Sequence, residues 1–217
     1  MNPASVSTLV AALANARDGD RRLIVAIAGA PGSGKSTLSE HVRDALNAQD
    51  DGIAEILPMD GYHLDNAILD ARGWRMRKGA PHTFDVDAFA RDLARVKSAD
   101  EPVFVPVFDR DLDLSRGSAR EISPACRIVI VEGNYLLLDE APWNRLAGLF
   151  DVRVFLAVPE AVLERRLVQR WLDHGFSPDK AQAKALGNDI PNARLVASHS
   201  VGADLVIENG DGPSQSP

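Results

Sequence analysis

The clearest chemical pattern in the chain is the glycine-rich stretch GAPGSGKST. It fits the spacing G-x-x-x-x-G-K-[S/T], in which backbone N–H groups turn toward a phosphate, the lysine reaches the β- and γ-phosphates, and the hydroxyl binds Mg²⁺. An apolar run leads into the stretch and a helical pattern leads out, so a helix N-terminus adds partial positive charge. The pattern predicts a nucleoside triphosphate site formed by Gly29, Ala30, Pro31, Gly32, Ser33, Gly34, Lys35, Ser36 and Thr37.

Two carboxylates stand where apolar runs end, and a charge there needs water, a metal or a partner. Asp60 ends such a run in LPMDGYH, and Glu132 follows IVIV. A carboxylate facing the γ-phosphate can orient an alcohol and accept its proton, so Asp60 is a candidate catalytic base. Glu132 and Ser36 are the candidate Mg²⁺ residues, with Glu132 acting through water. The alternatives are a turn-capping aspartate before Gly61 and a solvated glutamate.

Arginines on one predicted helix could close over the phosphates. In PEAVLERRLVQRWLDHG, Arg166 and Arg170 are one turn apart on a face separate from the apolar stripe. Arginines closing there would neutralise the charge that builds during transfer and would exclude water, so we expect them to be catalytic together with Lys35. The alternative is a solvated helix face.

A second group of cations follows Asp60 in the segment RGWRMRKGAPH. This segment lines an acceptor pocket or binds an anionic group in one interpretation, and is an exposed basic loop in the other. We take Arg77 from it as a candidate substrate residue. His63 and His82 are also candidate substrate contacts, with a structural or exposed histidine as the alternative.

Apolar runs and helical patterns alternate along the chain, which predicts an α/β fold with a mostly parallel central sheet. The expected strands are Leu23–Ala28, Ile53–Leu57, Val103–Phe108, Ile128–Val131, Val152–Val158 and Leu205–Ile207. The expected helices are Ala4–Ala16, Lys35–Ala48, Asp87–Ser98, Glu160–His174, Pro178–Leu186 and Pro191–Ser198. Because ligands gather at the carboxyl ends of strands in such sheets, the strand before Asp60 should lie near the strand before the phosphate loop.

The expected fold is therefore the P-loop NTPase three-layer α/β/α sandwich with a small helical lid. We expect a single domain over residues 1–208, with an N-terminal helix within 1–20 and the lid at about 160–187. The tail from Asn209 onward, residues 209–217, should be disordered because it is rich in glycine, proline and serine.

Composition narrows the possible partners of the chain. Its 217 residues are 45% hydrophobic, and its formal net charge of −7 argues against nucleic acid as a partner. Cys126 is the only cysteine, so no intrachain disulfide framework exists. The N-terminus has no basic segment before its short apolar patch, and no run approaches a membrane span. We expect a cytoplasmic, soluble protein without a membrane partner.

Three classes of nucleotide-binding protein compete. A GTPase switch needs an Asn-Lys-x-Asp motif, which is absent, and the Asp70-x-x-Gly73 match follows no apolar strand. A motor or transport ATPase usually joins its phosphate loop to a Walker-B aspartate, whereas IVIV here ends in Glu132-Gly133-Asn134. A small-molecule kinase needs a phosphate loop, a helper for Mg²⁺, a carboxylate at an acceptor pocket and an arginine-bearing lid, and candidates for all four are present.

The order of these motifs resembles the uridine kinase, pantothenate kinase and phosphoribulokinase group of P-loop kinases. GAPGSGKST, MDGYH, RKGAPHTFDVDAF, PVFD, VIVEGNYLLL and NDIPNARLV occur in the group's order between about Leu23 and Ile207. The whole pattern is most similar to the bacterial subgroup named fructose transport system kinases.

The resemblance implies roles for individual residues. It makes Asp60 the catalytic base, assigns Arg166 and Arg170 to the lid, and places Glu132 where the group has a strand-end glutamate. It places the following residues at the acceptor: Tyr62, Phe84, Asp109, Arg110 and Asn192. It also implies ATP and Mg²⁺ as cofactors. Related kinases are often dimers or higher oligomers, so a homodimer is one assembly to expect, and the sequence does not choose among them.

The expected function is an ATP- and Mg²⁺-dependent transfer of the γ-phosphate to a hydroxyl of a small metabolite. The acceptor is a sugar such as fructose, a nucleoside or a pantothenate-like compound, and the sequence does not choose among them. The alternative is a nucleotide-binding regulatory or transport-coupled ATPase without a small acceptor.

Overall fold

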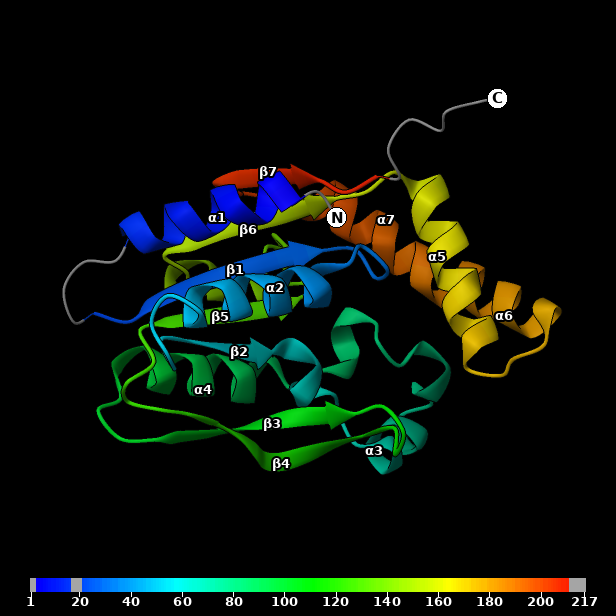
Figure 1. Ribbon diagram of the computed structural model, residues 1–217. Coiled ribbons are helices and arrows are strands. Elements are labelled where there is room, and N and C mark those ends of the chain that lie inside the picture. Colours follow the sequence, from blue (N-terminus) through cyan, green and yellow to red (C-terminus); the bar gives the residue numbers. More distant parts are fainter. Residues whose placement is uncertain (1–2, 17–20, 211–217) are drawn as a thin grey trace, which may run out of the picture.

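The computed structural model describes residues 3–16 and 21–210, and its centre is a parallel sheet (Figure 1). Five strands lie in the order β2-β5-β1-β6-β7, and every pairing between them is parallel. Their bounds are β1 Leu23–Gly29, β2 Ala54–Pro58, β5 Ile128–Gly133, β6 Val152–Ala157 and β7 Leu205–Glu208. The predicted α/β fold is confirmed.

Helices cover both faces of the sheet, which makes the three layers. Successive residues of β1 alternate between two apolar cores, since Leu23, Val25 and Ile27 enter one and Ile24, Ala26 and Ala28 enter the other. Apolar residues of α1 (Pro3–Ala16) and α2 (Lys35–Asn47) fill the first core, and those of α4 (Val86–Ser98) fill the second. Burial on both faces explains why the strand sequences are continuously apolar.

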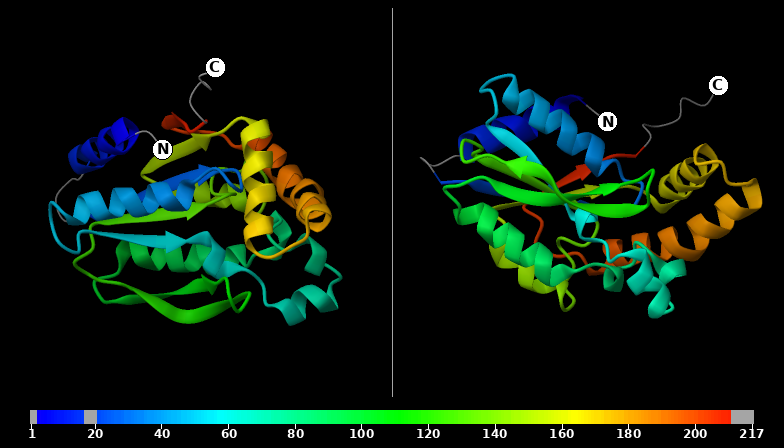
Figure 2. Two further views of the ribbon diagram at one scale, coloured as in Figure 1. Left: turned by 45° about the vertical axis from the view of Figure 1, so that its right-hand side comes forward. Right: turned by 90° about the horizontal axis from the view of Figure 1, so that it is seen from below.

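The run Val103–Phe108 forms a strand, but it does not join the parallel sheet. It belongs to β3 (Val103–Asp109), which pairs antiparallel with β4 (Leu114–Ile122) in a separate hairpin. The hairpin packs against the turn Met59–Tyr62, below β2 in Figure 1 and in the left view of Figure 2. No strand was expected at β4 because most of its residues are polar and exposed and show no apolar pattern.

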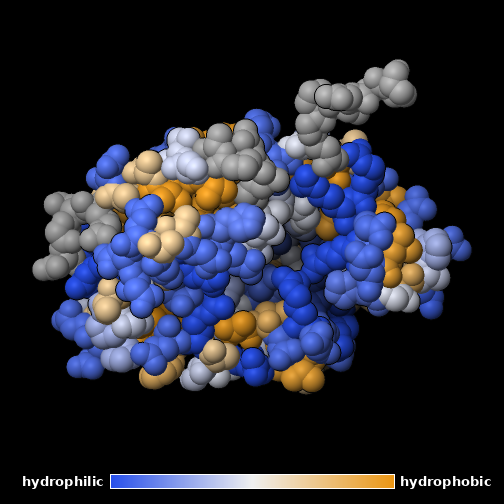
Figure 3. Space-filling view, in the orientation of Figure 1, coloured by the Kyte–Doolittle hydropathy of each residue, from blue (hydrophilic) through white to orange (hydrophobic). Residues whose placement is uncertain are grey.

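The remaining helices gather beyond the carboxyl ends of the strands. They are α3 (Asn66–Ala71), α5 (Glu160–Asp173), α6 (Pro178–Lys184) and the start of α7 (Ile190–His199), and a π-helical turn, Ala185–Asp189, joins the last two. Further along α7, Val196 is buried in the second core. The helices α5 and α6 project from the body at the right of Figure 1. On the face shown in Figure 3, hydrophilic residues predominate between this projection and the body of the sheet.

Two expectations concern the ends of the chain. The predicted N-terminal helix is present as α1, whereas residues 1–2 and 17–20 lie outside the described part. Residues 211–217 of the predicted tail also lie outside it. Across the part of the chain that is described, no helix has the length and apolar character that a membrane crossing requires.

Candidate active site

The predicted phosphate loop joins β1 to α2, as the motif requires. Gly32 and Gly34 have φ values of 77° and 90°, which glycine adopts without the steric cost of a side chain. The Lys35 ammonium donates a hydrogen bond of 3.3 Å to the Ala30 carbonyl within the loop. A Cβ added to Gly32 would lie 3.1 Å from Cγ of Leu167 on α5, so the loop is packed closely against that helix.

The Lys35 side chain is half-buried and lies near two carboxylates. Burial lowers the pKa of its ammonium, while the charges of Glu132 and Asp60 raise it. Both carboxylates favour the protonated, positively charged form of Lys35. The lysine can therefore present a positive charge to a phosphate.

Asp60 reaches the site through a tight turn after β2. The last residue of β2, Pro58, pairs with Glu132 of β5, and Ile27 of β1 pairs with the same glutamate. Strand β5 therefore separates the strand of Asp60 from β1, and the carboxyl ends of all three strands meet at one edge. Gly61 follows, and a Cβ on it would lie 2.3 Å from the Pro106 carbonyl oxygen of β3. Only glycine allows this approach between the turn and the hairpin.

The Asp60 carboxylate lies among positive groups. Arg110 at the hairpin tip lies 3.3 Å from its Oδ2, and the His63 ring donates through Nδ1 to the Asp60 carbonyl at 2.8 Å. Burial alone would raise the pKa of the carboxyl, but the charges of His63, Arg110, Lys35 and Arg170 outweigh it and hold the pKa below its usual value. Asp60 is thus an ionised carboxylate at neutral pH.

Glu132 and Ser36 lie together, as predicted for a Mg²⁺ site. The Ser36 hydroxyl donates to Glu132 Oε2 at 3.3 Å. Burial, followed by the negative charge of Asp60, raises the pKa of the Glu132 carboxyl, and Lys35 opposes the shift. Among the described residues, no group of three or more histidine, cysteine, aspartate or glutamate side chains could hold a metal by itself. Mg²⁺ in kinases is held by one or two carboxylates together with phosphate oxygens, so this donor pair suits it.

Two cavities adjoin at this edge of the sheet. The phosphate cavity surrounds the glycine-rich loop and includes Lys35, Ser36 and Glu132 in its wall. The side cavity extends from it toward the hairpin and the helices α6 and α7. The residues lining both cavities are Pro31, Asp60, Arg110, Asn134 and Arg170.

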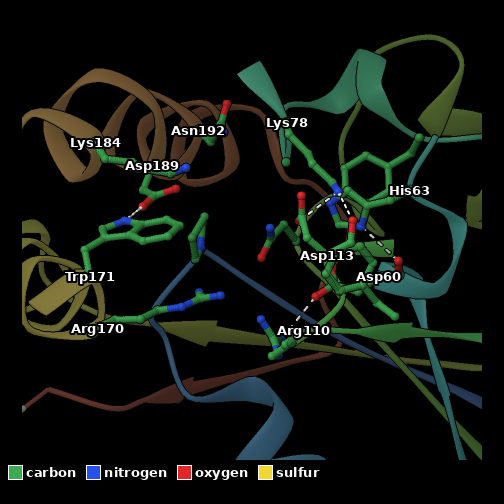
Figure 4. A pocket seen from close by; sticks show the side chains of 15 residues that line it. Asp60, His63, Lys78, Arg110, Asp113, Arg170, Trp171, Lys184, Asp189 and Asn192 are labelled. Atoms are coloured by element: carbon green, nitrogen blue, oxygen red, sulfur yellow. Dashed lines mark hydrogen bonds and ion pairs between the residues drawn. The ribbon is translucent and has the colours of Figure 1, made fainter. Parts of the chain in front are cut away.

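Figure 4 shows how the side cavity is built from two groups of side chains. The groups are Arg170, Trp171, Lys184 and Asp189 on one side, and Asp60, His63, Lys78 and Asp113 on the other. The Trp171 indole N–H donates to Asp189 at 2.6 Å, and the Lys184 ammonium lies 4.3 Å from the Trp171 ring centroid. The Lys78 ammonium donates to Asp113 Oδ1 and to Asn66 Oδ1, each at 2.8 Å, and so ties the hairpin tip to the segment after Asp60.

The structure brings together some of the predicted acceptor residues. His63, Phe84, Arg110 and Asn192 line the side cavity, together with Asp60 and Arg170. Phe84 and His63 lie against each other with ring centroids 4.1 Å apart. His63 follows the turn after β2, and Phe84 lies just before α4. Arg110 belongs to the hairpin and Asn192 to α7, so the four residues are distant in sequence.

Other predicted acceptor residues lie elsewhere. Tyr62 is 4% exposed and its hydroxyl donates to Asp92, because its ring belongs to the apolar core around α4. His82 packs against Trp74, and Asp109 forms an ion pair with Arg116 across the hairpin at 3.3 Å. None of these three lines the side cavity.

Arg77 and Arg166 also lie outside the side cavity. Arg77 donates to the Gly187 carbonyl at 3.0 Å, which joins the basic segment to the π-helical turn. Arg166 donates to the carbonyls of Gly32 and Asn209 at 3.5 and 3.2 Å. Of the two predicted lid arginines, only Arg170 lines the phosphate and side cavities.

Asn209 was expected at the start of a disordered tail, and the structure corrects this expectation. The residue is 8% exposed, its backbone N–H donates to Ala157 at 2.8 Å, and its side chain donates to the Ser33 carbonyl at 2.7 Å. Composition alone could not reveal these bonds, because they depend on where β7 places the chain after its last residue.

The fold and the site define a P-loop kinase. A loop with the phosphate-binding sequence pattern stands beside a lysine, two further cations and a carboxylate that also faces a second cavity. The sequence profile of the Phosphoribulokinase / Uridine kinase family matches residues 24–210, so the chain belongs to this family. The predicted resemblance is confirmed.

Individual relatives agree with the family assignment. The chain is 37% identical over 190 residues to the "Uncharacterized protein YggC" of Escherichia coli, covering 87% of this chain and 78% of that protein. It is 34% identical over 197 residues to "Putative uridine kinase C227.14" of Schizosaccharomyces pombe, covering 87% and 83%. A crystal structure described as a "putative fructose transport system kinase" from Silicibacter sp. TM1040 is similar with a TM-score of 0.87 and 47% identity, covering 93% and 98%.

Proposed function

We propose that the protein transfers the γ-phosphate of ATP to a hydroxyl group of a small metabolite and that it requires Mg²⁺. The observation that carries the proposal is the position of Asp60, which lines both the phosphate cavity and the side cavity. A hydroxyl bound in the side cavity and a γ-phosphate bound in the phosphate cavity would meet at this carboxylate.

The surrounding charges suit phosphoryl transfer. The phosphate loop and Lys35 would hold the β- and γ-phosphates, and Arg110 and Arg170 would face the transferred group. In a loose transition state these cations stabilise the charge on the equatorial oxygens, and the base receives the proton late. The ionised Asp60 orients the hydroxyl and then accepts that proton. A low pKa is compatible with this role because the proton moves only after most of the bond to the phosphorus has formed.

Mg²⁺ would be held by Ser36 and, through water, by Glu132. The ion supplies charge neutralisation at the β- and γ-phosphates when it is bound. Glu132 is 8% exposed, and burial together with the charge of Asp60 raises the pKa of its carboxyl more than Lys35 lowers it. A cation near this carboxylate would favour its charged form.

The acceptor is a sugar such as fructose, a nucleoside or a pantothenate-like compound. Two relatives carry names that point to an acceptor: "Putative uridine kinase C227.14" supports a nucleoside, and the "putative fructose transport system kinase" supports a sugar. The side cavity supports an acceptor in general, because the competing function, an ATPase without an acceptor, has no use for it. The homodimer, the cytoplasmic location and the lack of nucleic-acid and membrane partners stay predictions.

The test is ADP release from Mg-ATP across a panel of sugars, nucleosides, pantothenate and their phosphates. We expect one acceptor to raise turnover far above the background hydrolysis, and Asp60→Asn to abolish the increase while the variant stays folded, as checked by circular dichroism. Asp139→Asn is the matched control, because Asp139 is exposed and lines neither cavity. ADP release at one rate with every compound, unaffected by Asp60→Asn, would support the ATPase instead.

A further inference from the structure

Asn134 occupies the junction of the two cavities and has no role in the mechanism described above. It follows β5 directly, two residues after Glu132. The other residues that line both cavities are Pro31 of the phosphate loop, Asp60, Arg110 and Arg170. Asn134 is therefore the one neutral amide among groups that each have a part in binding or transferring the phosphoryl group.

The Asn134 side chain has an unsatisfied hydrogen-bond acceptor. Its Oδ1 is buried and has no hydrogen-bond partner within the described residues. A buried polar atom without a partner is costly and rare, and at a binding site the missing partner is commonly a ligand or water. The missing group must be a donor, because a carbonyl oxygen can only accept.

The chemistry of the two ligands decides which of them can supply this donor. The phosphate oxygens of Mg-ATP carry no hydrogen at neutral pH to donate. The hydroxyl groups of an acceptor each carry one donor hydrogen. One of these hydroxyls is taken by Asp60, so the donor to Asn134 is another one.

A second amide in the side cavity agrees with this. Asn192 on α7 is 3% exposed and lines the cavity, and its side chain makes no hydrogen bond to any part of the chain that the structure describes. Phe84 and Phe108 supply apolar wall to the same cavity. Unpaired neutral amides beside aromatic rings suit a ligand with several hydroxyls on a carbon skeleton.

We propose that the Asn134 side-chain carbonyl accepts a hydrogen bond from a second hydroxyl of the acceptor, close to the hydroxyl that Asp60 activates. The inference rests on the proposed function and deepens it, since it makes the substrate a compound with at least two neighbouring hydroxyls. The bond fixes the rotation of the acceptor about the reacting hydroxyl and so presents that oxygen to the γ-phosphate. A simple monoalcohol is then a poor substrate because it leaves Oδ1 unpaired.

The experiment combines a variant with an altered substrate. Once the panel has identified the acceptor, kcat/KM is measured for the acceptor and for its single-deoxy analogues. Each compound is tested with the wild type and with Asn134→Leu. Leucine has a shape similar to that of asparagine but no side-chain carbonyl. We expect Asn134→Leu to lower kcat/KM for the acceptor by about 10- to 100-fold, the loss typical of leaving a buried polar partner unpaired. One deoxy analogue should show a similar loss with the wild type and no further loss with the variant.

Controls separate this role from a general loss of structure. Thermal melting of Asn134→Leu should match the wild type, because leucine keeps the shape of the side chain. Asn144→Leu is the matched control on an exposed position, with kcat/KM equal to that of the wild type. If Asn134→Leu does not fold, the deoxy series on the wild type still decides, because the inference requires one non-reacting hydroxyl to be essential.

The outcomes distinguish this inference from the proposed function. Acceptor-dependent turnover with equal kcat/KM in the wild type and Asn134→Leu overturns the inference and leaves the kinase intact. Additive losses in the variant and the deoxy analogue also overturn it. If no compound raises ADP release, the proposed function fails and the inference fails with it.

Discussion

The Asn209 side-chain amide donates a 2.7 Å hydrogen bond to the carbonyl oxygen of Ser33, a residue 176 positions earlier in the phosphate loop. The Arg166 guanidinium donates to the Asn209 carbonyl at 3.2 Å and to the Gly32 carbonyl at 3.5 Å. The chain after β7, the phosphate loop and α5 are thus joined by two side chains. These bonds hold the back of the loop, on carbonyls rather than on the N–H groups that a phosphate would use.

The first prediction concerns this link. Asn209→Ala removes the donor to Ser33 and should weaken ATP binding by roughly 1–2 kcal/mol, the cost of leaving a buried carbonyl unpaired. Because Asn209 does not line the side cavity, KM for the acceptor should not change. Titration with a fluorescent ATP analogue measures the effect, with Asn144→Ala as the exposed control. Equal nucleotide affinity in Asn209→Ala and the wild type would show that the loop holds its shape without this bond.

The two arginines of α5 should have separable effects. Arg170 lines both cavities, so Arg170→Gln should lower kcat by about 10²–10³, the range for removing a transition-state donor. Arg166→Gln should act mainly on KM for ATP, because Arg166 donates to the phosphate loop and to Asn209. Steady-state kinetics at varied ATP and acceptor separate the two. A larger loss of kcat in Arg166→Gln than in Arg170→Gln would reverse the assignment.

The pH dependence of kcat/KM for Mg-ATP should reflect protonation of the Glu132 carboxylate. Burial and the charge of Asp60 raise the pKa of its carboxyl above the usual value. As the pH falls through this raised pKa, Glu132 takes up a proton and loses its hold on Mg²⁺, so kcat/KM for Mg-ATP should fall at a pH where an ordinary glutamate is still ionised. Asp60 stays charged over the same interval because its pKa is lowered.

Glu132→Gln tests the origin of this acid limb. The variant cannot titrate at this position, so its lower kcat/KM should no longer fall over that pH interval. Stopped assays at several pH values, each with saturating Mg²⁺ and with limiting Mg²⁺, give the profile. An acid limb of the same position in the variant would assign the titration to another group.

Gly61 should be essential for the placement of Asp60. In Gly61→Ala the added Cβ meets the Pro106 carbonyl oxygen of β3, and overpacking of this kind costs about 1–3 kcal/mol of folding free energy. Activity should fall as well, because relief of the clash moves the turn that carries Asp60. Gly148→Ala is the control, since an added Cβ there has no described atom within 4 Å. Urea denaturation compares the two, and equal midpoints would contradict the packing argument.

The strands and the strand-end carboxylates could be predicted from sequence because their signals are local. Asp60 and Glu132 follow apolar runs, and runs of that kind become parallel strands whose ends share one edge. The order of the strands could not be predicted in the same way, since no local sequence feature indicates that β5 lies between β2 and β1. The polar strand β4 carries no apolar pattern, so the hairpin and its contact with Gly61 were not predictable either.

The sequence by itself determined the phosphate loop, because glycines, lysine and serine act there as one contiguous segment whose backbone conformation is local. Tertiary structure alone decided which side chains meet in the side cavity. Asn134, Lys78 and Trp171 reach it from different elements. Lys78 bonds to Asp113 and Trp171 to Asp189, and neither partner is close to it in sequence. Such contacts depend on strand order and helix packing, which arise from the burial of the whole apolar core rather than from any short stretch of residues.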